Sequence, residues 1–314
     1  MYSIVIHGGA GTILRQLMTK EKETQYRNAL NEAILIAEEV LLKEGAALDA
    51  AMAAVVLMEN NSCFNAGKGA VYTHAGTHEL DAAIMCGNTL KAGAVSLVQR
   101  VKNPIKLAKQ VMDKSEHVWL NGQGAEQFAK EQGLEMVDNT YFDTPMRYKQ
   151  WQKALEQSRI TLDHDDLPDA NKYGTVGAVV RDKWGNLAAA TSTGGMTNKK
   201  YNRIGDTPII GSATYANNAT CAVSCTGHGE YFIRGVIAYD VSCLMAYKNL
   251  SLQEACDWAI HKNLQQLGGK GGLIAIDAQG NMAWSLNSKG MYRAKKTIGQ
   301  DVQIEIFEPK RDFW

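Results

Sequence analysis

The alternation of apolar and polar residues predicts where this chain forms strands. Residues 2–6 alternate and are rich in β-branched side chains, so they predict a strand that runs into a glycine-rich loop at residues 7–11. Residues 179–187 and 275–282 share another pattern, in which an Asp-x-x-Gly-Asn turn joins two apolar strands. The glycine of such a turn supplies the positive φ angle that a bulged hairpin loop requires. These two segments therefore predict β-hairpins.

Apolar residues at helical spacing predict helices between the strands. A helix is predicted over residues 21–43, with Gly45 as its C-terminal cap, because one of its faces carries the apolar residues Leu30, Ile34, Ala37 and Leu41. The segment that follows is rich in alanine and apolar nearly all round, which predicts a buried helix that begins at Asp49.

Capping residues and proline predict where further helices begin. Asn103 followed by Pro104 predicts an N-cap and the first residue of a helix. Three more helices are predicted, over residues 147–158, over residues 230–247, and from Ser251 onward, where Glu254 completes a capping box. Strands that are apolar on both faces and alternate with helices predict an α/β (α+β) fold in which helices cover two stacked sheets.

One segment differs in character from the rest of the chain. Residues 159–174 are polar and acidic, contain a proline and are the most linker-like stretch. They end abruptly at Thr175, where an apolar strand begins. A length of 314 residues fits about two domains or one large α/β unit, and it suffices to bury a core without disulfides or a metal ion.

Composition excludes several classes of function. Lys plus Arg and Asp plus Glu both number 33, so the zero net charge argues against a general nucleic-acid binder. No apolar run approaches the ~20 residues of a membrane helix, and the first residues do not resemble a signal peptide. The spacing of Cys221 and Cys225 lacks the second ligand pair of a zinc site. The six cysteines are therefore expected to be free thiols in a reducing compartment, the cytoplasm.

The junction between Gly174 and Thr175 carries a candidate chemistry. If the chain were cut there, Thr175 would hold a hydroxyl and a free α-amine on one residue. An α-amine titrates at about 7.7–8.0, which suits a general base near neutral pH. Threonine with its own N-terminal amine is a known form of activated nucleophile. The dipeptide alone is better explained by a strand that happens to begin with threonine.

Longer motifs change this balance. They follow one another along nearly the whole chain, at residues 7–11, 64–70, 79–82, 88–95, 103–104, 174–179, 186–199, 203–208 and 225–230. In sequence and order they resemble the isoaspartyl peptidases with L-asparaginase activity of the bacterial and plant type, which are N-terminal-nucleophile hydrolases. The resemblance implies a four-layer αββα sandwich. It also implies that a precursor cuts itself before Thr175 into an α subunit, residues 1–174 with the flexible linker 159–174, and a β subunit, residues 175–314.

The resemblance also assigns the catalytic residues. Thr175 matches the nucleophile of both self-cleavage and substrate hydrolysis, and Thr193 matches a second threonine whose hydroxyl binds it. Thr226, through its hydroxyl, and Gly227, through its backbone N–H, match an oxyanion hole, whose donors stabilise the charge that develops in the transition state. Asn65 matches an asparagine that positions groups around the nucleophile.

A substrate site is implied beside these residues. Arg203 matches the residue that binds the substrate α-carboxylate, a role that the planar guanidinium fills better than lysine does. Asp206 matches the acceptor of the substrate α-ammonium. The remaining substrate-binding residues are Ile204, Gly205, Thr226, Gly227, His228 and Gly229, of which His228 lines the pocket while the α-amine acts as base. Alternatively, Arg203 and Asp206 could form only a weak local ion pair.

The resemblance further implies a structural sodium ion and an assembly. Backbone carbonyls would hold the ion, as suits a hard cation, at the residues Met58, Glu59, Asn61, Phe64, Ala66 and Lys68. No cofactor is expected for the chemistry. Two α and two β subunits are expected to form a heterotetramer, with neither a nucleic acid nor a membrane as a partner.

The function that follows is a self-cleaving threonine amidohydrolase. It would release L-aspartate from isoaspartyl dipeptides and from L-asparagine through an acyl-enzyme on Thr175. Three alternatives share the fold: a glycosylasparaginase, a threonine endopeptidase, and a non-catalytic amino-acid-binding homologue that is never cut. The sequence around Thr193 favours the peptidase over the glycosylasparaginase, and the compact chain lacks the long insertions expected of the endopeptidase.

Overall fold

The computed structural model describes residues 1–156 and 174–308. The predicted linker at residues 159–174 therefore lies outside the described residues, except for Gly174.

Twelve strands form two sheets in the described residues. The larger sheet contains β1 Ser3–Gly11, β2 Leu80–Cys86, β3 Ala92–Val98, β4 Trp119–Asn121, β5 Thr175–Arg181, β6 Leu187–Thr193, β11 Gly290–Thr297 and β12 Gln303–Phe307. The smaller sheet contains β7 Thr214–Ala216, β8 Cys221–Gly227, β9 Gly271–Asp277 and β10 Met282–Leu286. Their orders are β12-β11-β1-β5-β6-β2-β3-β4 and β10-β9-β8-β7, so β5 and β6 lie in the middle of the larger sheet.

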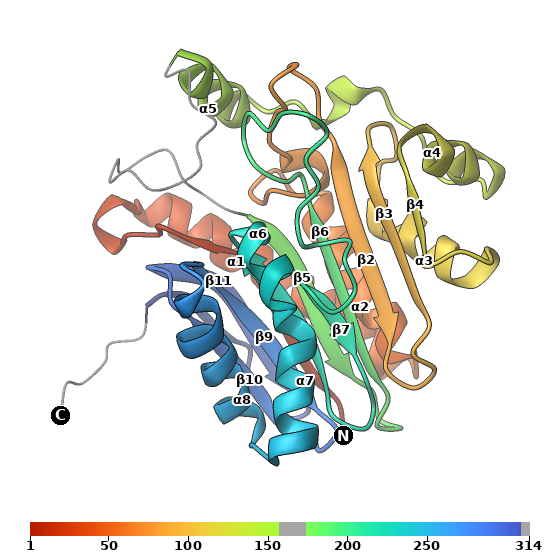
Figure 1. Cartoon of the computed structure of the whole chain (residues 1–314), viewed down its shortest axis with the longest axis vertical. Helices are drawn as coiled ribbons and strands as arrows, with labels where there is room; N and C mark the ends of the chain where they lie inside the picture. Colours follow the sequence, from red (N-terminus) through yellow and green to blue (C-terminus); the bar gives the residue numbers. More distant parts are fainter. Residues whose placement is uncertain (157–173, 309–314) are drawn as a thin grey trace.

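Helices cover the outer face of each sheet (Figure 1). The eight helices of the described residues are α1 Lys20–Leu42, α2 Ala47–Glu59, α3 Pro104–Lys114, α4 Gly122–Glu131, α5 Pro145–Glu156, α6 Gly229–Gly235, α7 Ile237–Lys248 and α8 Leu252–Trp258. Short turns are η1 Arg15–Leu17, η2 Gly67–Gly69 and η3 Asn139–Phe142, and α8 continues into a π-helical turn, η4 Ala259–Leu264. Helices α1, α2 and α3 pack on the larger sheet, and α7 and α8 pack on the smaller one.

The two sheets stack face to face, which gives four layers and confirms the predicted αββα arrangement. Strand β5 shows why its residues are apolar on both faces. Val176 and Val180 pack with the helices of the first layer, whereas Val179 packs between the sheets with residues such as Ile274. Because successive side chains of a strand point to opposite faces, a strand in an inner layer of the sandwich must be apolar throughout.

The two predicted hairpins are confirmed, and their turns are built alike. Strand β5 pairs with β6, and β9 with β10. Gly185 and Gly280 have φ angles of 88° and 91°. In each turn an aspartate Oδ1 accepts two backbone N–H groups, Asp182 from residues 184 and 186 and Asp277 from residues 279 and 281.

The ends of the predicted helices need correction where distant residues intervene. Helix α2 begins at Ala47, not at Asp49, because Asp182 Oδ2 accepts the backbone N–H of Ala47 at 3.2 Å. Helix α1 ends at Leu42, one residue earlier than predicted, and the left-handed residue after it is Glu44, with φ of 63°, and not Gly45. The start of α3 at Pro104 with Asn103 as N-cap and the capping box of α8 are both confirmed.

Three further predictions were wrong in detail. Residues 230–247 form α6 and α7, because Val236 between them has a φ angle of 48° and the first N–H groups of α7 bond to the carbonyls of Ser212 and Gly211. The glycine-rich residues 7–11 belong to strand β1, which keeps pairing with β11 across an irregularity between His7 and Ala10. Helix α5 begins at Pro145, two residues before its predicted start.

The Asp182 side chain yields a prediction about stability. Asp182→Asn keeps an oxygen for the turn but replaces the oxygen that caps α2, so the free energy of unfolding should fall by about 1–2 kcal/mol in urea titrations. The matched control is Asp277→Asn. In the wild-type turn, Asp277 Oδ2 accepts a hydrogen bond from the side-chain amide of Asn281. In the variant, the Asn281 side chain can rotate so that its oxygen accepts from the new amide, and the turn keeps this bond. Equal losses in both variants would show that the cap contributes nothing.

Candidate active site

The register of one strand pair brings the predicted nucleophile to its predicted partner. Thr175 is the first residue of β5 and Thr193 the last residue of β6, and the antiparallel pairing places them opposite one another. Asp81 of β2 lies opposite Thr193 on the other side. The candidate site is therefore an edge of the larger sheet at which three adjacent central strands begin or end.

A hydrogen-bonded chain joins the two threonines to the Gly174–Thr175 bond. The Thr175 hydroxyl donates to Thr193 Oγ1 at 3.2 Å, and the Thr193 hydroxyl donates to the carbonyl oxygen of Gly174 at 3.0 Å. The backbone N–H of Gly195 donates to Thr193 Oγ1 at 3.1 Å. Thr175 and Thr193 are only 7% and 3% exposed. Thr193 thus contacts both the attacking hydroxyl and the carbonyl that this hydroxyl would attack.

Asn65 holds the turn that follows Thr193. Its amide donates to the carbonyl of Gly195 at 2.7 Å, and its backbone carbonyl accepts the N–H of Gly194 at 3.1 Å. Gly174 packs against the same residue, since a methyl group on Gly174 would lie 2.6 Å from Asn65 Cβ. The structure therefore places Asn65 beside the Gly174–Thr175 junction.

The oxyanion pair predicted at the end of β8 lies at the same edge of the molecule. Strand β8 stacks on β5, where a methyl group on Gly177 would lie 2.0 Å from Ser224 Oγ. Thr226 follows two residues later, and its Oγ1 accepts the N–H of Ala10 at 3.3 Å. Because β1 runs antiparallel to β5, the residues of β1 beyond His7 lie toward Thr175. Thr226 and Gly227 therefore approach the end of β5 that carries Thr175.

Arg203 makes a two-pronged ion pair, but with Glu230 and not with Asp206. Its Nε and Nη2 donate to the two carboxylate oxygens of Glu230 at 2.8 and 2.9 Å. Burial alone would lower the pKa of Arg203 and raise that of Glu230. The hydrogen bonds of the pair reverse both effects, so the pKa of Arg203 is raised and that of Glu230 lowered. Both side chains are therefore charged, and the guanidinium has a fixed orientation.

Asp206 is buried with an unsatisfied oxygen. The residue is 5% exposed, and its Oδ2 has no hydrogen-bond partner among the described residues. Burial raises its pKa from 3.8 to about 7, against the lowering influence of Arg203. A buried acceptor without a donor is costly, which points to a cationic or N–H ligand at this position.

Gly229 brings the two charged side chains together. A methyl group there would lie 2.7 Å from Asp206 Oδ1 and 2.9 Å from Arg203 Nη2, so both side chains rest against its Cα. Gly205 similarly lies under the guanidinium, with Ile204 in the same segment. His228 is 5% exposed, packs edge-on against Tyr231 and has Nε2 3.7 Å from Glu230 Oε2. Of the predicted substrate-binding residues, Arg203, Gly205, Asp206 and Gly229 thus lie in one cluster, with His228 beside Glu230.

In the loop predicted to hold sodium, backbone carbonyls pack closely against glycine residues. A methyl group on Gly67 would lie 2.3 Å from the Glu59 carbonyl oxygen, and one on Gly69 would lie 2.0 Å from that of Phe64. The carbonyls therefore crowd around glycine backbone. The Lys68 ammonium points away and donates to the carbonyl of Tyr141. No cluster of three His, Cys, Asp or Glu that could hold a metal occurs in residues 1–156 and 174–308.

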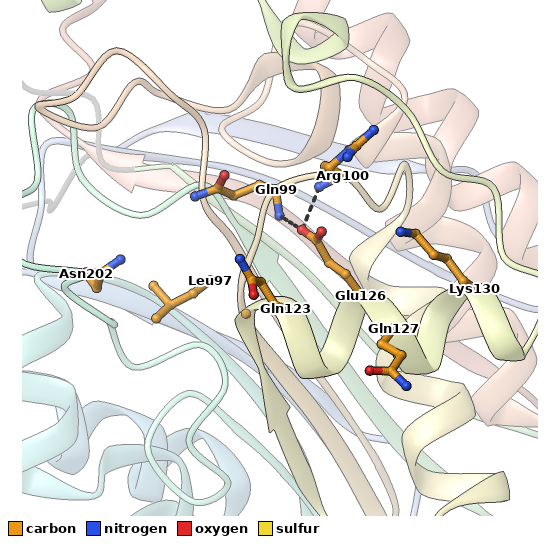
Figure 2. A pocket seen from close by; sticks show the side chains of 9 residues that line it. Leu97, Gln99, Arg100, Gln123, Glu126, Gln127, Lys130 and Asn202 are labelled. Carbon is orange, nitrogen blue, oxygen red and sulfur yellow. Dashed lines mark hydrogen bonds between the residues drawn. The ribbon is translucent and has the colours of Figure 1, made fainter.

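A surface hollow of about 620 Å³ lies near the site but contains none of its charged groups. Figure 2 shows its lining, which comes from the end of β3, the residues that follow it and α4, with Asn202 at one side. Glu126 lines the hollow and accepts the backbone N–H groups of Gln99 and Arg100. Asn202, the neighbour of Arg203, connects the hollow to the candidate site.

Comparisons with known proteins agree with this geometry. The family model described as Asparaginase matches residues 1–306. An isoaspartyl peptidase of Salmonella typhimurium is 53% identical over 97% of this chain and 98% of its own length. An isoaspartyl peptidase of Escherichia coli is 50% identical over 98% of this chain and 97% of its own. A plant-type L-asparaginase of Pyrococcus abyssi is 40% identical over 93% and 95%.

The chain belongs to the asparaginase family. It is accordingly a hydrolase, and the predicted family and enzyme class are confirmed.

Sequence reasoning missed one residue of this asparaginase-family site. Glu230 ends the motif at residues 225–230, yet no role was predicted for it. A signal was present, because a buried arginine needs a counter-charge and the motif contains a carboxylate. Sequence separation hid the pairing, since 27 residues separate Arg203 from Glu230.

The structure also bears on the predictions of free cysteines and of no membrane-spanning helix. The six cysteines are free, as predicted, although Cys86 and Cys243 are only partly buried. None of the helices in the described ranges combines the length and the apolar character that crossing a membrane takes.

The pKa of Asp206 predicts how stability depends on pH. Because the folded state raises this pKa to about 7, it binds the proton more tightly than the unfolded chain does between about pH 4 and 7. The stability that this proton provides is lost as the pH rises through that window. Asp206→Asn removes the effect, so its free energy of unfolding relative to wild type should increase by about 1–4 kcal/mol from pH 4 to pH 7.

Urea titrations at several pH values measure this difference. The matched control is Asp301→Asn, an exchange on the exposed surface that should leave stability unchanged at every pH. A difference between Asp206→Asn and wild type that stays flat from pH 4 to 7 would contradict the assignment.

Proposed function

We propose that this protein cuts itself before Thr175 and then hydrolyses β-aspartyl dipeptides and, less selectively, L-asparagine. The observation that supports this most strongly is the chain of hydrogen bonds from Thr175 through Thr193 to the Gly174 carbonyl. The names of the relatives, isoaspartyl peptidase and plant-type L-asparaginase, support the substrate class.

Self-cleavage would begin with the Thr175 hydroxyl. Its oxygen attacks the Gly174 carbonyl carbon, and the C–N bond to Thr175 breaks, so that an ester replaces the amide. Water then hydrolyses the ester, which leaves a carboxylate on Gly174 and a free α-amine on Thr175. Thr193 already donates to the oxygen that becomes negative in the transition state, which is the arrangement that electrostatic catalysis requires.

Substrate hydrolysis would reuse the same groups. The new α-amine takes the proton of the Thr175 hydroxyl, whose oxygen attacks the β-carbonyl carbon of the substrate. The Thr226 hydroxyl and the Gly227 N–H stabilise the oxyanion, and the amine of the leaving group departs with a proton. Water then releases L-aspartate from the acyl-enzyme and restores Thr175. These steps make Thr175 the only covalent participant.

Recognition of the substrate would rest on two charges. Arg203, oriented by Glu230, presents its remaining guanidinium N–H groups to the substrate α-carboxylate. Asp206 offers its unsatisfied Oδ2 to the α-ammonium, whose charge favours the ionised carboxylate. A substrate therefore needs both α-groups free, as β-aspartyl dipeptides and L-asparagine have.

The alternatives make different products. A glycosylasparaginase releases a sugar amine from a glycosylated asparagine, and a threonine endopeptidase cuts proteins. A non-catalytic binding homologue keeps the clamp but stays uncut. The presence of Thr175, Thr193 and both oxyanion residues in one place favours catalysis over binding alone.

Assembly and location belong to the same proposal. We propose that residues 1–174 and 175–314 remain together as α and β subunits and form a heterotetramer. The pairing of β5 with β1 and of β6 with β2 supports the first part, that the two subunits remain together, because it interleaves their strands in one sheet. Six free cysteines support a reducing compartment, the cytoplasm.

The nucleophile gives the central prediction. Purified wild-type protein should yield two fragments on a denaturing gel, one of which begins at Thr175 by N-terminal sequencing, and should release aspartate from β-Asp-Leu. Thr175→Ala should abolish both results, because no hydroxyl remains to attack either carbonyl. Thr193→Val should slow cutting strongly, whereas Thr193→Ser, which keeps the hydroxyl, should restore most of it.

The outcomes separate the alternatives. Wild-type protein that stays a single chain but binds L-aspartate would indicate the non-catalytic homologue. Cut protein that acts on glycosylated asparagine, and not on β-Asp-Leu, would indicate the glycosylasparaginase.

We also propose that backbone carbonyls of residues 58–68 hold a structural sodium ion that fixes the loop carrying Asn65. The thermal midpoint should then be higher in sodium chloride than in choline chloride of equal ionic strength. Gly67→Ala, whose methyl group would collide with the Glu59 carbonyl, should lower the midpoint and remove the sodium effect. Gly124→Ala is the control, since open space surrounds that position. Equal midpoints in both salts would overturn the proposal.

A further inference from the structure

The segment between Thr193 and Arg203 links the nucleophile to the substrate clamp, and its backbone is strained near the clamp. Asn198, Tyr201 and Asn202 have φ angles of 64°, 58° and 54°. Residues other than glycine adopt this left-handed region only at a cost, so surrounding contacts must hold them there. The contacts that do so decide where the backbone of Arg203 lies.

One carboxylate contacts this segment at two points. Glu79 immediately precedes β2 and is 6% exposed. Its Oε2 lies 3.3 Å from the Lys199 ammonium, and its Oε1 accepts the Asn202 side-chain amide at 3.0 Å. The Lys199 ammonium also donates to the Glu79 backbone carbonyl at 3.3 Å. Glu79 therefore contacts two residues, Lys199 and Asn202, that both precede Arg203 in the chain.

The two contacts differ in what they fix. Lys199 is held by other bonds as well, because its carbonyl accepts the His74 N–H at 2.9 Å and its aliphatic chain packs on Gly195. Asn202 adjoins Arg203 directly, and its amide reaches back to Glu79 across the sheet edge. Arg203 is thus held on one side by the Asn202–Glu79 bond and at its guanidinium by Glu230.

We propose that Glu79 is a positioning residue for the substrate clamp, because its bond with Asn202 fixes the backbone from which Arg203 reaches the substrate carboxylate. This inference rests on the proposed role of Arg203. Neither Glu79 nor Asn202 touches the reacting carbonyl, so loss of the bond should weaken the binding of substrate and transition state alike. The expected signature is a higher KM with an unchanged kcat.

The decisive variant is Asn202→Gly, tested on the cut, active enzyme with L-asparagine and β-Asp-Leu. Glycine accepts the left-handed backbone without strain, which offsets part of the stability lost with the bond to Glu79, so the variant should fold. KM should rise about three- to tenfold, the range expected for loss of one ordinary hydrogen bond, and kcat should stay within about twofold.

The matched control is Tyr201→Gly. Tyr201 has almost the same φ angle, but its side chain is 93% exposed. The exchange gives the same backbone freedom one residue away and leaves the Asn202–Glu79 bond in place. Its KM should therefore equal that of wild type. Equal increases in both variants would mean that backbone freedom, and not the bond, changes KM, and would overturn the proposal.

Changes at Glu79 test the other half of the pair. Glu79→Gln keeps an oxygen for the Asn202 amide, so KM should stay near the wild-type value. Glu79→Ala should raise KM, and adding Asn202→Gly to it should raise KM no further, since the bond is already gone. Additive effects would overturn the proposal. If Glu79→Ala fails to fold, the comparison of Asn202→Gly with Tyr201→Gly still decides.

A parallel variant separates this inference from the proposed function. Arg203→Ala should raise KM far more than Asn202→Gly does. If Arg203→Ala leaves KM unchanged, the clamp itself is wrong. If Arg203→Ala raises KM and Asn202→Gly does not, the clamp stands and the positioning role of Glu79 fails.

Discussion

The pairing of β5 with β6 at the centre of the larger sheet is the contact on which the site depends. Its register places Thr175 opposite Thr193, and the two hydroxyls then meet at 3.2 Å. A shift by one residue would turn every side chain of β5 to the opposite face and remove the nucleophile from its partner. The register is secured at the far end of the hairpin, where Asp182 closes the turn and also caps α2. Stability and catalytic geometry therefore share one element.

The site is also where the fold accepts unfavourable burial. Arg203 is compensated by Glu230, but the buried Asp206 keeps an oxygen without a partner. If the site served stability alone, we would expect the Asp206 carboxylate to have a partner for each oxygen, or an apolar residue to stand in its place. The unpaired oxygen supports the proposed zwitterionic substrate, whose ammonium would complete the charge pairing on binding. The backbone before Arg203 is likewise unfavourable in itself, and contacts with neighbouring side chains, such as the bond from Asn202 to Glu79, hold it in place.

Much of the fold could be predicted from local pattern. The hairpins, the start of α3 and the capping box of α8 followed from turn residues, proline and capping residues, whose effects extend over only a few positions. The errors arose where a distant residue supplied the missing partner. Helix α2 begins earlier because Asp182 caps it, and the helix predicted over residues 230–247 breaks at Val236 because its next N–H groups bond to the segment before β7.

The sequence by itself determined the layered architecture, the family and the residues that carry the candidate chemistry, because apolar periodicity and the motifs are local properties of the chain. Only the tertiary structure decided which of those residues meet. It showed that Arg203 pairs with Glu230, that Asp206 is left without a full set of partners, and that Glu79 reaches Asn202. Charged side chains act over a few ångströms, and distances of that size between residues far apart in the chain are fixed only when the sheets and helices pack.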